Sequence, residues 1–336
     1  MRTVFFSIGL CVSSFFYSCN SKDASTNYIE ISGYAQGTTY RVVAHNPENK
    51  NLQKSIDSIL ITFDSVFNNY TPLSIISRIN TNDSDVILNS QFRYFFEKSQ
   101  YFYEITEGAF DITIAPLANA WKFGFHNDSI IPDQEKIDSL LQFIGMEKIQ
   151  IQNNKIHKQK PQIQIIGNAI AQGYSTDIIS EFLLSQNIQD FLVDVGGEMR
   201  VQGNNPNGVA WNIGINTPQE HSAHNEYNIL IALKNKAIAT SGNYRKFYIK
   251  DGKKYSHTIH PKTGFPVNNN LLSASIITDI CIDADALATA CMVMGLEKSI
   301  EIINANPQFQ AIFMYEEKDS LHTYISPELE QYIVLK

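Results

Sequence analysis

Two short stretches of this 336-residue chain combine side chains that could do chemistry together. The stretch 106–113, Thr-Glu-Gly-Ala-Phe-Asp-Ile-Thr, presents the carboxylates of Glu107 and Asp111. Far downstream, Asp285 and Thr289 lie one helical turn apart, so a carboxylate and a hydroxyl would share one helix face. Mg²⁺ binds such hard oxygens together with water and phosphate. The spacing therefore indicates a magnesium site, or else an aspartate that caps the helix and a threonine that bonds a carbonyl one turn back.

Glycine turns and a histidine motif lie between these stretches. Gly196-Gly197-Glu198 and Thr240-Ser241-Gly242 each follow a strand-like run, and such turns let backbone N–H groups approach phosphate oxygens. The chain contains neither GxGxxG nor GxxxxGK[ST], which excludes a Rossmann fingerprint and a P-loop. Pro261 argues against a zinc-binding helix that carries His257 and His260. His257 is either a general acid or base, or only a hydrogen-bonding turn residue.

Hydrophobic periodicity predicts the elements that must position these residues. Strands are expected over 28–34 and 39–44 around the turn Ala35-Gln36-Gly37-Thr38, and a buried strand is expected over 191–195. Apolar residues at helical spacing predict helices over 56–67, 92–103, 133–143 and 169–184, a short one near 74–80, and one from about 283 to 294. Residues 116–124 form a loop or a short helix, and residues 211–278 are mostly β. Because strands and helices mix without a regular βαβ alternation, the predicted class is α+β.

The N-terminus is typical of an export signal. Arg2 precedes an apolar run from Val4 to Phe16, which is shorter than the about 20 residues that span a bilayer. Ser18-Cys19 and the polar residues that follow resemble a bacterial lipobox; the alternative is an ordinary signal peptide with an incidental cysteine. We expect a lipoprotein signal peptide over 1–18, a polar tether over 19–27 and one functional unit over 28–336. A lipid on Cys19 would hold this exported protein on a membrane.

Composition and cysteine usage exclude other classes. The net charge is -8 and the basic residues are scattered, so nucleic-acid binding is not expected. With 43% hydrophobic residues, the chain can form a substantial core. No CxxC motif is present, so the sequence supports neither a zinc site nor a redox motif of that type. Cys281, expected at a strand end, and Cys291, expected in a helix, are interpreted as packed apolar thiols.

Several blocks of residues, taken in order along the chain, resemble those of the FAD:protein FMN transferases, also called ApbE-like flavin transferases. The resemblance runs from about Gly33 to Gly295. The blocks that carry it are 37–40, 70–74, 77–80, 106–113, 116–117 with Trp121, 169–174 with Asp177, 195–198, 239–242, 257–264 and 284–289. The resemblance implies a two-lobed α+β, T-fold-like structure with an FAD cleft between its lobes, and Mg²⁺ on the FAD pyrophosphate.

The activity that the resemblance implies is attack of an acceptor-protein Ser or Thr hydroxyl on the FMN phosphorus, with AMP leaving. The implied catalytic residues are His257, as general base, and Asp285. The implied Mg²⁺ ligands are the side chains of Asp285 and Thr289 and the carbonyls of Ala169 and Ala288. The implied FAD contacts are Gln36, Gly37, Tyr70, Ala109, Phe110, Asp111, Gln172, Glu198, Ser241, His257 and Ile259.

The chain departs from the family pattern at several positions. Ile166 stands where an acidic residue is usual, His260 where Asp is common, Gln36 where Met is common and Gln172 where Lys is frequent. The missing acid would remove a ribose or adenine contact, and a lost hydrogen bond costs about 0.5–1.5 kcal/mol. That cost is too small to imply an inactive enzyme.

The resemblance also implies partners and a location. The acceptors would be flavoprotein subunits of redox complexes that carry a short recognition sequence around the modified Ser or Thr. The protein itself would be a bacterial lipoprotein, on the periplasmic side of the inner membrane or on the outer membrane. Two alternatives remain at this point. One is an FAD pyrophosphatase that releases free FMN and AMP, and the other is a flavin-binding lipoprotein without catalytic activity.

Overall fold

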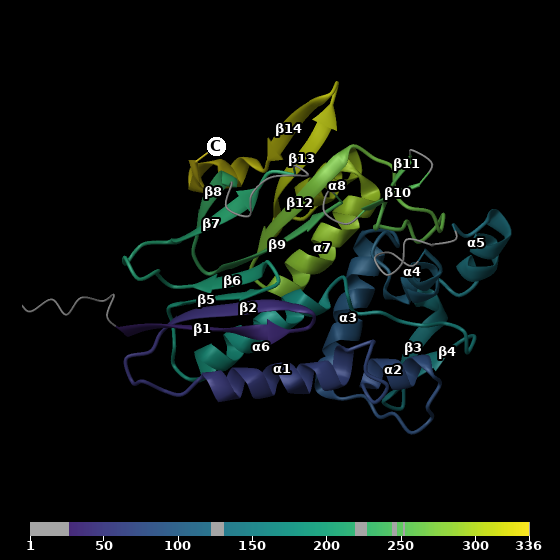
Figure 1. The fold of residues 1–336 in the computed structure, drawn as a ribbon, viewed down its shortest axis with the longest axis horizontal. Coiled ribbons are helices and arrows are strands. Elements are labelled where there is room, and N and C mark those ends of the chain that lie inside the picture. The colour runs from purple at the N-terminus through teal and green to yellow at the C-terminus, as the bar shows by residue number, and fades with distance from the viewer. Residues whose placement is uncertain (1–26, 122–130, 219–226, 244–246, 251–252, 336) are drawn as a thin grey trace, which may run out of the picture.

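The computed structural model describes residues 27–121, 131–218, 227–243, 247–250 and 253–335. The expected signal peptide and Cys19 lie outside these ranges, so both stay predictions. Within the described residues, helices and strands mix irregularly, which confirms the α+β class (Figure 1). None of the described helices is both long and apolar enough to cross a membrane.

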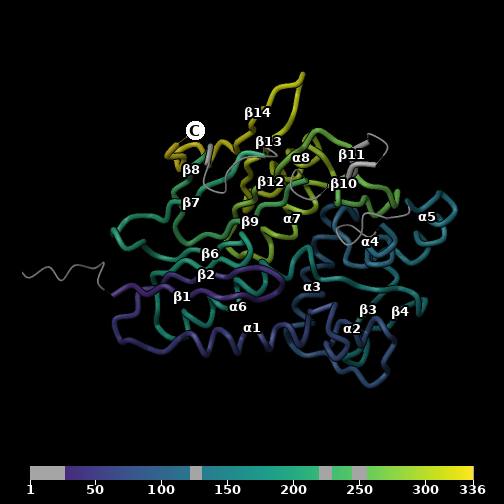
Figure 2. Tube along the Cα trace, viewed as in Figure 1, coloured from purple at the N-terminus to yellow at the C-terminus, as the bar shows by residue number. Residues whose placement is uncertain are grey.

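An eight-stranded antiparallel sheet runs through the structure (Figures 1 and 2). Its strands, in spatial order, are β1 Tyr28–Ala35, β2 Thr38–His45, β5 Phe191–Val195, β6 Glu198–Gln202, β9 Lys236–Gly242, β12 Leu271–Thr278, β13 Gln310–Glu317 and β14 Ser320–Ile325. Because Ala35 pairs with Thr38, Gln36 and Gly37 form a two-residue turn, with φ of 54° and 74°. Both positive φ values suit the tight turns that join antiparallel strands.

Four helices pack against one face of this sheet: α1 Gln53–Phe67, α6 Ala171–Ser185, α7 Cys281–Met294 and α8 Leu296–Ala305. Helix α7 lies on β9 and β12, and α6 lies beside α7 over β5 and β6. The strands alternate as a two-sided sheet requires. Val42 packs in the cluster under α1 and α6, whereas its neighbour Val43 packs on the opposite face.

The opposite face of the sheet is covered by a three-stranded sheet in the order β15 Ile333–Leu335, β8 Tyr227–Leu233 and β7 Trp211–Asn216. Its inner side chains, among them Ile213 and Ile231, pack with Ile277 and Ile312 of the large sheet. A short 3-10 helix, η4 Pro327–Tyr332, precedes β15 and adds Leu329 to this cluster. The large sheet is therefore buried on both faces, which keeps the strand ends that reach the site in fixed positions.

The remaining elements lie beyond α1 and α6, to the right in Figure 1. They are α2 Ile75–Asn80, α3 Ser90–Ile105, η2 Ile112–Ile114, α4 Ala115–Trp121, α5 Gln134–Leu141, η3 Met146–Lys148 and the hairpins β3 Ile149–Gln152 with β4 Lys155–Lys158 and β10 Phe247–Lys250 with β11 Lys253–Ser256. An aromatic core that includes Phe67, Phe92, Phe95 and Phe102 joins α1 and α3 to α7. This core attaches the helical part to the sheet.

The structure corrects several helix boundaries and decides one alternative. Helix α1 begins at Gln53 and not at 56, α3 spans 90–105 and not 92–103, and α5 spans 134–141 and not 133–143. Helix α6 begins at Ala171 and not at residue 169, and α7 begins at Cys281 and not near 283. Cys281 is therefore a helical residue and not a strand end. Cys281 and Cys291 are both buried free cysteines, which agrees with their interpretation as packed apolar thiols. Residues 115–121 form a helix, which decides between the loop and the short helix considered for this segment.

Candidate active site

A cavity of about 510 Å³ opens where the helical part meets the sheet, a size typical of small-molecule sites. Segments that are far apart in sequence line it. They are the α3–η2 connection, the residues before and at the start of α6, the β5–β6 turn, β7, the end of β9, the turn after β11, and α7. The predicted site residues among its lining are Ala109, Phe110, Asp111, Ala169, Gln172, Glu198, Ser241, His257, Ile259, Asp285 and Thr289.

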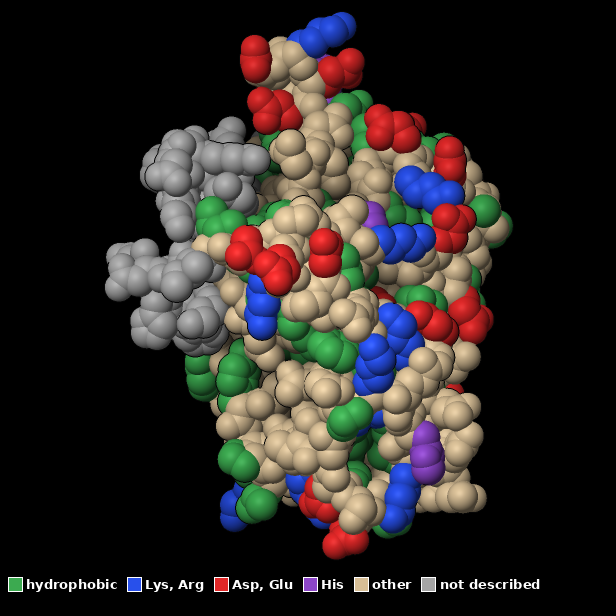
Figure 3. Space-filling model, turned by 90° about the vertical axis from the view of Figure 1, so that its right-hand side faces the viewer, with side chains coloured by type: hydrophobic (Ala, Val, Ile, Leu, Met, Phe, Trp, Pro, Cys, Tyr) green, Lys and Arg blue, Asp and Glu red, His purple; other side chains and the backbone are tan. Residues whose placement is uncertain are grey.

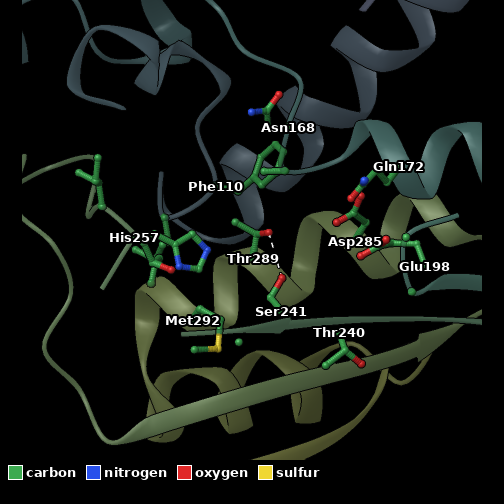
Figure 4. A pocket seen from close by; sticks show the side chains of 18 of the residues that line it. Phe110, Asn168, Gln172, Glu198, Thr240, Ser241, His257, Asp285, Thr289 and Met292 are labelled. Carbon is green, nitrogen blue, oxygen red and sulfur yellow. Dashed lines mark hydrogen bonds between the residues drawn. The ribbon is translucent and has the colours of Figure 1, made fainter. Parts of the chain in front are cut away.

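Asp285 and Thr289 project from successive turns of α7 toward this cavity, as their spacing predicted (Figure 4). The Thr289 hydroxyl lies 3.2 Å from the Ser241 hydroxyl at the end of β9, where either can donate. Asp285 is only 6% exposed. In Figure 4 the Thr289 side chain lies between His257 on one side and Asp285 on the other. The cavity therefore presents a carboxylate, two hydroxyls and an imidazole along one wall.

The Asp285 carboxylate caps a helix, but not its own. Its Oδ2 accepts a 2.9 Å hydrogen bond from the backbone N–H of Gly173 in the first turn of α6. That N–H is the one that would otherwise bond the Ala169 carbonyl four residues earlier. Among the described residues no hydrogen bond reaches the Ala169 carbonyl. Asp285 therefore does cap a helix, but this helix is α6 and not α7. The Ala169 carbonyl, at a residue that lines the cavity, is left without its usual helical partner.

These oxygens fit a Mg²⁺ ion. Burial and the neighbouring Asp177 together raise the pKa of Asp285 to about 7, although the Gly173 N–H bond opposes the rise. No group of three Asp, Glu, His or Cys side chains gathers as a metal cage among the described residues. Mg²⁺ commonly binds through one or two protein carboxylates, with water and substrate phosphates as the other ligands. Asp285, Thr289 and the Ala169 carbonyl make a partial ligand set of that type.

A second aspartate fixes α7 in the same way from the opposite helix. Asp177 of α6 accepts hydrogen bonds from the backbone N–H groups of Cys281, at 2.9 Å, and Ile282, at 2.8 Å. Its Oδ1 also lies 3.0 Å from Arg200, whose side chain is 11% exposed. Burial raises the pKa of Asp177 to about 6, and Arg200 and the two N–H groups oppose that rise. An aspartate from α7 therefore caps one N–H in the first turn of α6, and an aspartate from α6 caps two in the first turn of α7.

Gly173 allows the two helices to approach closely enough for this exchange. A Cβ at Gly173 would lie 2.5 Å from the Cys281 carbonyl oxygen and 2.7 Å from the Asp285 Cβ. No side chain fits at those distances. Gly173 and Asp177, one turn apart on α6, therefore lie on the face that packs on α7.

The 106–113 block is held by bonds within the turn that ends α3. Thr106 caps it, because its hydroxyl accepts a 3.0 Å bond from the Phe110 N–H. Asp111 Oδ1 accepts from both the N–H and the hydroxyl of Thr113, at 2.8 and 2.6 Å. The Thr113 hydroxyl in turn accepts from the Gly145 N–H at 2.7 Å. Burial raises the pKa of Asp111 to about 6. This network fixes Ala109, Phe110 and Asp111 at the cavity wall.

The Gly196-Gly197-Glu198 turn forms another part of the wall. Gly196 and Gly197 have φ of 70° and 110°, which favour glycine. A Cβ at Gly196 would lie 2.9 Å from Thr38 Cγ2 and 3.0 Å from Gln172 Nε2, so the turn packs directly under the Gln172 amide. Glu198 is 8% exposed. The glycines thus serve close packing at the cavity, as well as the tight turn.

The turn that carries His257 is supported from α4. The Trp121 indole N–H donates a 2.8 Å bond to the Gly264 carbonyl. Gly264 has φ of 74°, and its N–H donates to the His260 carbonyl at 2.8 Å. The Thr258 carbonyl accepts from the Val267 N–H at 2.9 Å. His260 does not line the cavity, and its Nδ1 accepts from the Lys262 N–H at 3.1 Å. As predicted, the HxxH spacing therefore lies on a turn and not on a helix.

Four predicted contacts do not line the cavity. Gln36 and Gly37 occupy the β1–β2 turn, Tyr70 is 75% exposed in the loop after α1, and Ala288 is fully buried inside α7. The two polar atoms of the Gln36 side-chain amide are nevertheless buried, and neither has a hydrogen-bond partner in the part of the chain that the structure describes. The carbonyl of Ala288 lies in the interior of α7, where the helix ladder uses such groups. Ile166 bonds the Ile112 carbonyl through its N–H and does not line the cavity either.

Several lining residues lie outside the motifs and blocks that the sequence indicated. They are Ile114, Ala118, Asn168, Met199, Gly214, Ile215, Asn216, Met292 and Val293. Asn168 directly precedes the Ala169 position, and Val293 continues the Asp285–Thr289 spacing by one more turn. Extending those two patterns by one step would have found both residues. Nothing local marks Gly214–Asn216, which β7 brings from the smaller sheet.

Comparisons with known proteins agree with this geometry. A family model described as the ApbE family matches residues 36–313. An FAD:protein FMN transferase of Vibrio cholerae is 32% identical over 91% of this chain and 92% of its own length. That of Escherichia coli K12 is 30% identical over 97% and 96%.

Solved structures give the same result. The flavin transferase ApbE of Vibrio cholerae superposes with a TM-score of 0.82, at 32% identity, over 91% of this chain and 99% of that one. The apo form of the Pseudomonas stutzeri flavinyl transferase ApbE gives a TM-score of 0.81 at 27% identity, over 91% and 96%. Both the sequence blocks and the fold are therefore shared over nearly the whole described chain, and the chain belongs to the ApbE family.

Proposed function

We propose that this protein transfers FMN from FAD to a Ser or Thr hydroxyl of an acceptor protein, with Mg²⁺ as cofactor and AMP as the second product. The observation that carries the proposal is the α7 wall of the cavity. Asp285, Thr289, Ala169 and His257 line one space large enough for a ligand, and no hydrogen bond from the described residues reaches the Ala169 carbonyl. The identity of the substrate, FAD, is inferred from the related enzymes, which are named FAD:protein FMN transferases.

Mg²⁺, when bound by Asp285, Thr289 and the Ala169 carbonyl, would neutralise charge on the pyrophosphate of FAD. The acceptor oxygen forms a bond to the FMN phosphorus while the bond from that phosphorus to the AMP oxygen breaks. His257 accepts the proton of the hydroxyl, and AMP leaves with the bonding electrons. Phosphoryl transfer of this kind depends mainly on positioning and charge neutralisation. The cavity walls supply the positioning, and a Mg²⁺ ion held by them would supply the charge neutralisation.

The decisive experiment incubates the protein with FAD, Mg²⁺ and an acceptor domain, and measures the intact mass of the acceptor. We expect a gain of one FMN residue that disappears when EDTA removes the metal. An unmodified acceptor together with release of free FMN and AMP would establish the pyrophosphatase instead. Tight FAD binding without either product would establish a flavin-binding protein without catalysis. Retention of full activity in excess EDTA would contradict the metal assignment alone.

We also propose that a lipid on Cys19 holds the protein on a bacterial membrane. The support is the Ser18-Cys19 sequence after the apolar run, followed by a polar tether that ends where β1 begins at Tyr28. The Cys19→Ala variant is expected to move from the membrane fraction to the soluble fraction after cell lysis. Purified Cys19→Ala should keep its FMN transfer rate, because the site lies entirely within later residues. A variant that still sediments with membranes would exclude the lipid anchor.

A further inference from the structure

The Thr289 hydroxyl differs from several other helical hydroxyls of this protein in its hydrogen-bond partner. Serine and threonine hydroxyls inside helices often donate to the carbonyl four residues earlier. Hydroxyls that do so on the described helices belong to Thr62, Ser99, Thr176, Ser180 and Ser299. For Thr289 that acceptor would be the Asp285 carbonyl, yet within the described ranges its hydroxyl pairs with Ser241 alone, at 3.2 Å. A contact between α7 and β9 therefore replaces the usual bond within the helix.

The end of β9 holds Ser241 opposite α7. Ser241 pairs with Ala274 of β12, and the pairing of the two strands continues to Gly242. Because side chains alternate along a strand, Ser241 shares a face with Ala239, which packs in the core cluster that contains much of α7. The sheet thus fixes Ser241 and the helix fixes Thr289, so the two hydroxyls separate only if the strand or the helix moves.

The neighbouring hydroxyl on β9 has a different partner. The Thr240 side chain points away from Ser241 in Figure 4, and its hydroxyl lies 2.8 Å from that of Ser275 on β12. This second hydroxyl pair has the same chemistry as the pair of Ser241 with Thr289, but it contains no residue of the proposed metal ligand set. It therefore provides an internal comparison for the first pair.

A hydroxyl that binds a cation must direct its single proton away from that cation. Each hydroxyl has one proton to donate and two lone pairs that accept. When Thr289 donates to the Ser241 oxygen, its lone pairs stay available to the cavity that Asp285 also lines. When Thr289 instead turns to the carbonyl one turn back, its oxygen moves toward the helix backbone. The contact with Ser241 therefore selects the direction that a metal ligand needs.

Cation binding at this site depends on local oxygens and not on a broad electrostatic field. Acidic and basic side chains are interspersed on the face shown in Figure 3, so no large region of one sign draws ions to that face. The ligand set proposed above contains one carboxylate, that of Asp285, and its other oxygens are neutral. Because a neutral oxygen binds a cation only through a lone pair that points at it, the direction of the Thr289 hydroxyl should affect the affinity for Mg²⁺.

We propose that Ser241 is a positioning residue for the metal site: its hydroxyl oxygen accepts a hydrogen bond from Thr289, so that a Thr289 lone pair faces Mg²⁺. A bound cation would reinforce this direction, because it draws electron density from the Thr289 oxygen and makes that hydroxyl the stronger donor. Ser241 then acts through Thr289 and not by contact with FAD, the role that the resemblance implied for it. This inference rests on the proposed function, because the metal belongs to that reaction.

The first readout is metal binding without turnover. Mn²⁺, which accepts the same oxygen ligands as Mg²⁺, is titrated into protein with ADP, which carries a pyrophosphate but no FMN, and free Mn²⁺ is measured by electron paramagnetic resonance. Ser241→Ala should raise the Kd for Mn²⁺ by about tenfold or more, as is typical when a group that orients a metal ligand is lost. The Kd for FAD in metal-free buffer should stay as in the wild type. Ser241→Thr keeps the hydroxyl and should restore Mn²⁺ binding.

A double-mutant cycle separates action through Thr289 from direct contact with FAD. Thr289→Val removes the hydroxyl that Ser241 orients, so the addition of Ser241→Ala should change the Kd for Mn²⁺ no further. The Mg²⁺ concentration for half-maximal FMN transfer should follow the same order in all of these variants.

Ser275→Ala is the matched control, since it removes one hydroxyl from the pair with Thr240 and should leave the Kd for Mn²⁺ unchanged. If Ser241→Ala raises the Kd for FAD in metal-free buffer, and its effect adds to that of Thr289→Val, then Ser241 contacts FAD directly and the proposal is wrong. It is also wrong if Ser241→Ala changes neither constant, while FMN transfer itself stands. Wild-type protein that binds no Mn²⁺ and transfers FMN fully in excess EDTA would contradict the metal in the proposed function.

Discussion

Asp285→Asn is expected to reduce Mg²⁺-dependent FMN transfer by about 10³-fold, the scale seen when one preorganised electrostatic group is removed from an active site. The amide oxygen can still accept the Gly173 N–H bond that Asp285 now accepts at 2.9 Å. The variant should therefore fold, and without Mg²⁺ its melting temperature should equal or exceed that of the wild type, because a costly buried carboxylate becomes neutral. Mg²⁺ titration of the transfer rate measures the effect directly.

Asp285→Ala is the less informative substitution, although it removes the same ligand. It would leave the Gly173 N–H buried without a partner, which costs about 1–3 kcal/mol. A loss of activity in that variant would then mix metal binding with the fit of α6 on α7. The resemblance implied a metal-binding role for Asp285; the structure adds a role in the packing of α6 on α7, through the Gly173 bond.

Asp283→Asn provides the control for Asp285→Asn. Asp283 lies two residues earlier on α7 and forms an ion pair with Lys98, with 2.7 Å between the charged atoms. It does not line the cavity. The control should therefore change stability slightly and leave the Mg²⁺ dependence of transfer as in the wild type. Normal Mg²⁺-dependent transfer by Asp285→Asn would exclude Asp285 as a metal ligand.

Local patterns predicted those parts of the structure that local interactions determine. The aromatic residues of α3 recur at helical spacing, and all of Phe92, Phe95 and Phe102 are buried as that spacing requires. Asp285 and Thr289 share a face for the same reason. The glycine turns at 196–197 and 242 reach the cavity because each directly follows a strand whose end the sheet holds in place.

Long-range contacts explain what the sequence did not predict. The start of α7 was expected near Asp283, because Asp283 is the nearest local residue that can cap a helix. Its actual cap is Asp177, which is 104 residues before Cys281. Likewise, Trp121 supports the His257 turn through a bond to Gly264 that spans 143 residues. Periodicity and turn chemistry contain no information about such pairs, so the cavity lining from β7 also escaped prediction.

Asp177→Ala is expected to lower the free energy of unfolding by about 3–5 kcal/mol, the cost typical of removing one partner from a buried charge pair. It leaves Arg200 without its buried partner and leaves the Cys281 and Ile282 N–H groups without their acceptor. Urea unfolding measures the loss. Asp177→Asn should lose less, because its amide oxygen can still accept from α7. The N-terminus of α7 is thus a point where helix stability and site geometry depend on one side chain.

The matched control for Asp177 is Glu181→Gln on the same helix. Glu181 lies 2.8 Å from the same Arg200, but its side chain is 62% exposed, so the change should cost less than about 1 kcal/mol. If Asp177 positions the site as well as stabilising the fold, Asp177→Asn should also need more Mg²⁺ for half-maximal transfer at temperatures where it is fully folded. Glu181→Gln should not. The reason for the expected change is that a displaced α7 would move Asp285 and Thr289 relative to the Ala169 carbonyl. If the Mg²⁺ dependence of Asp177→Asn is unchanged, Asp177 contributes only to stability.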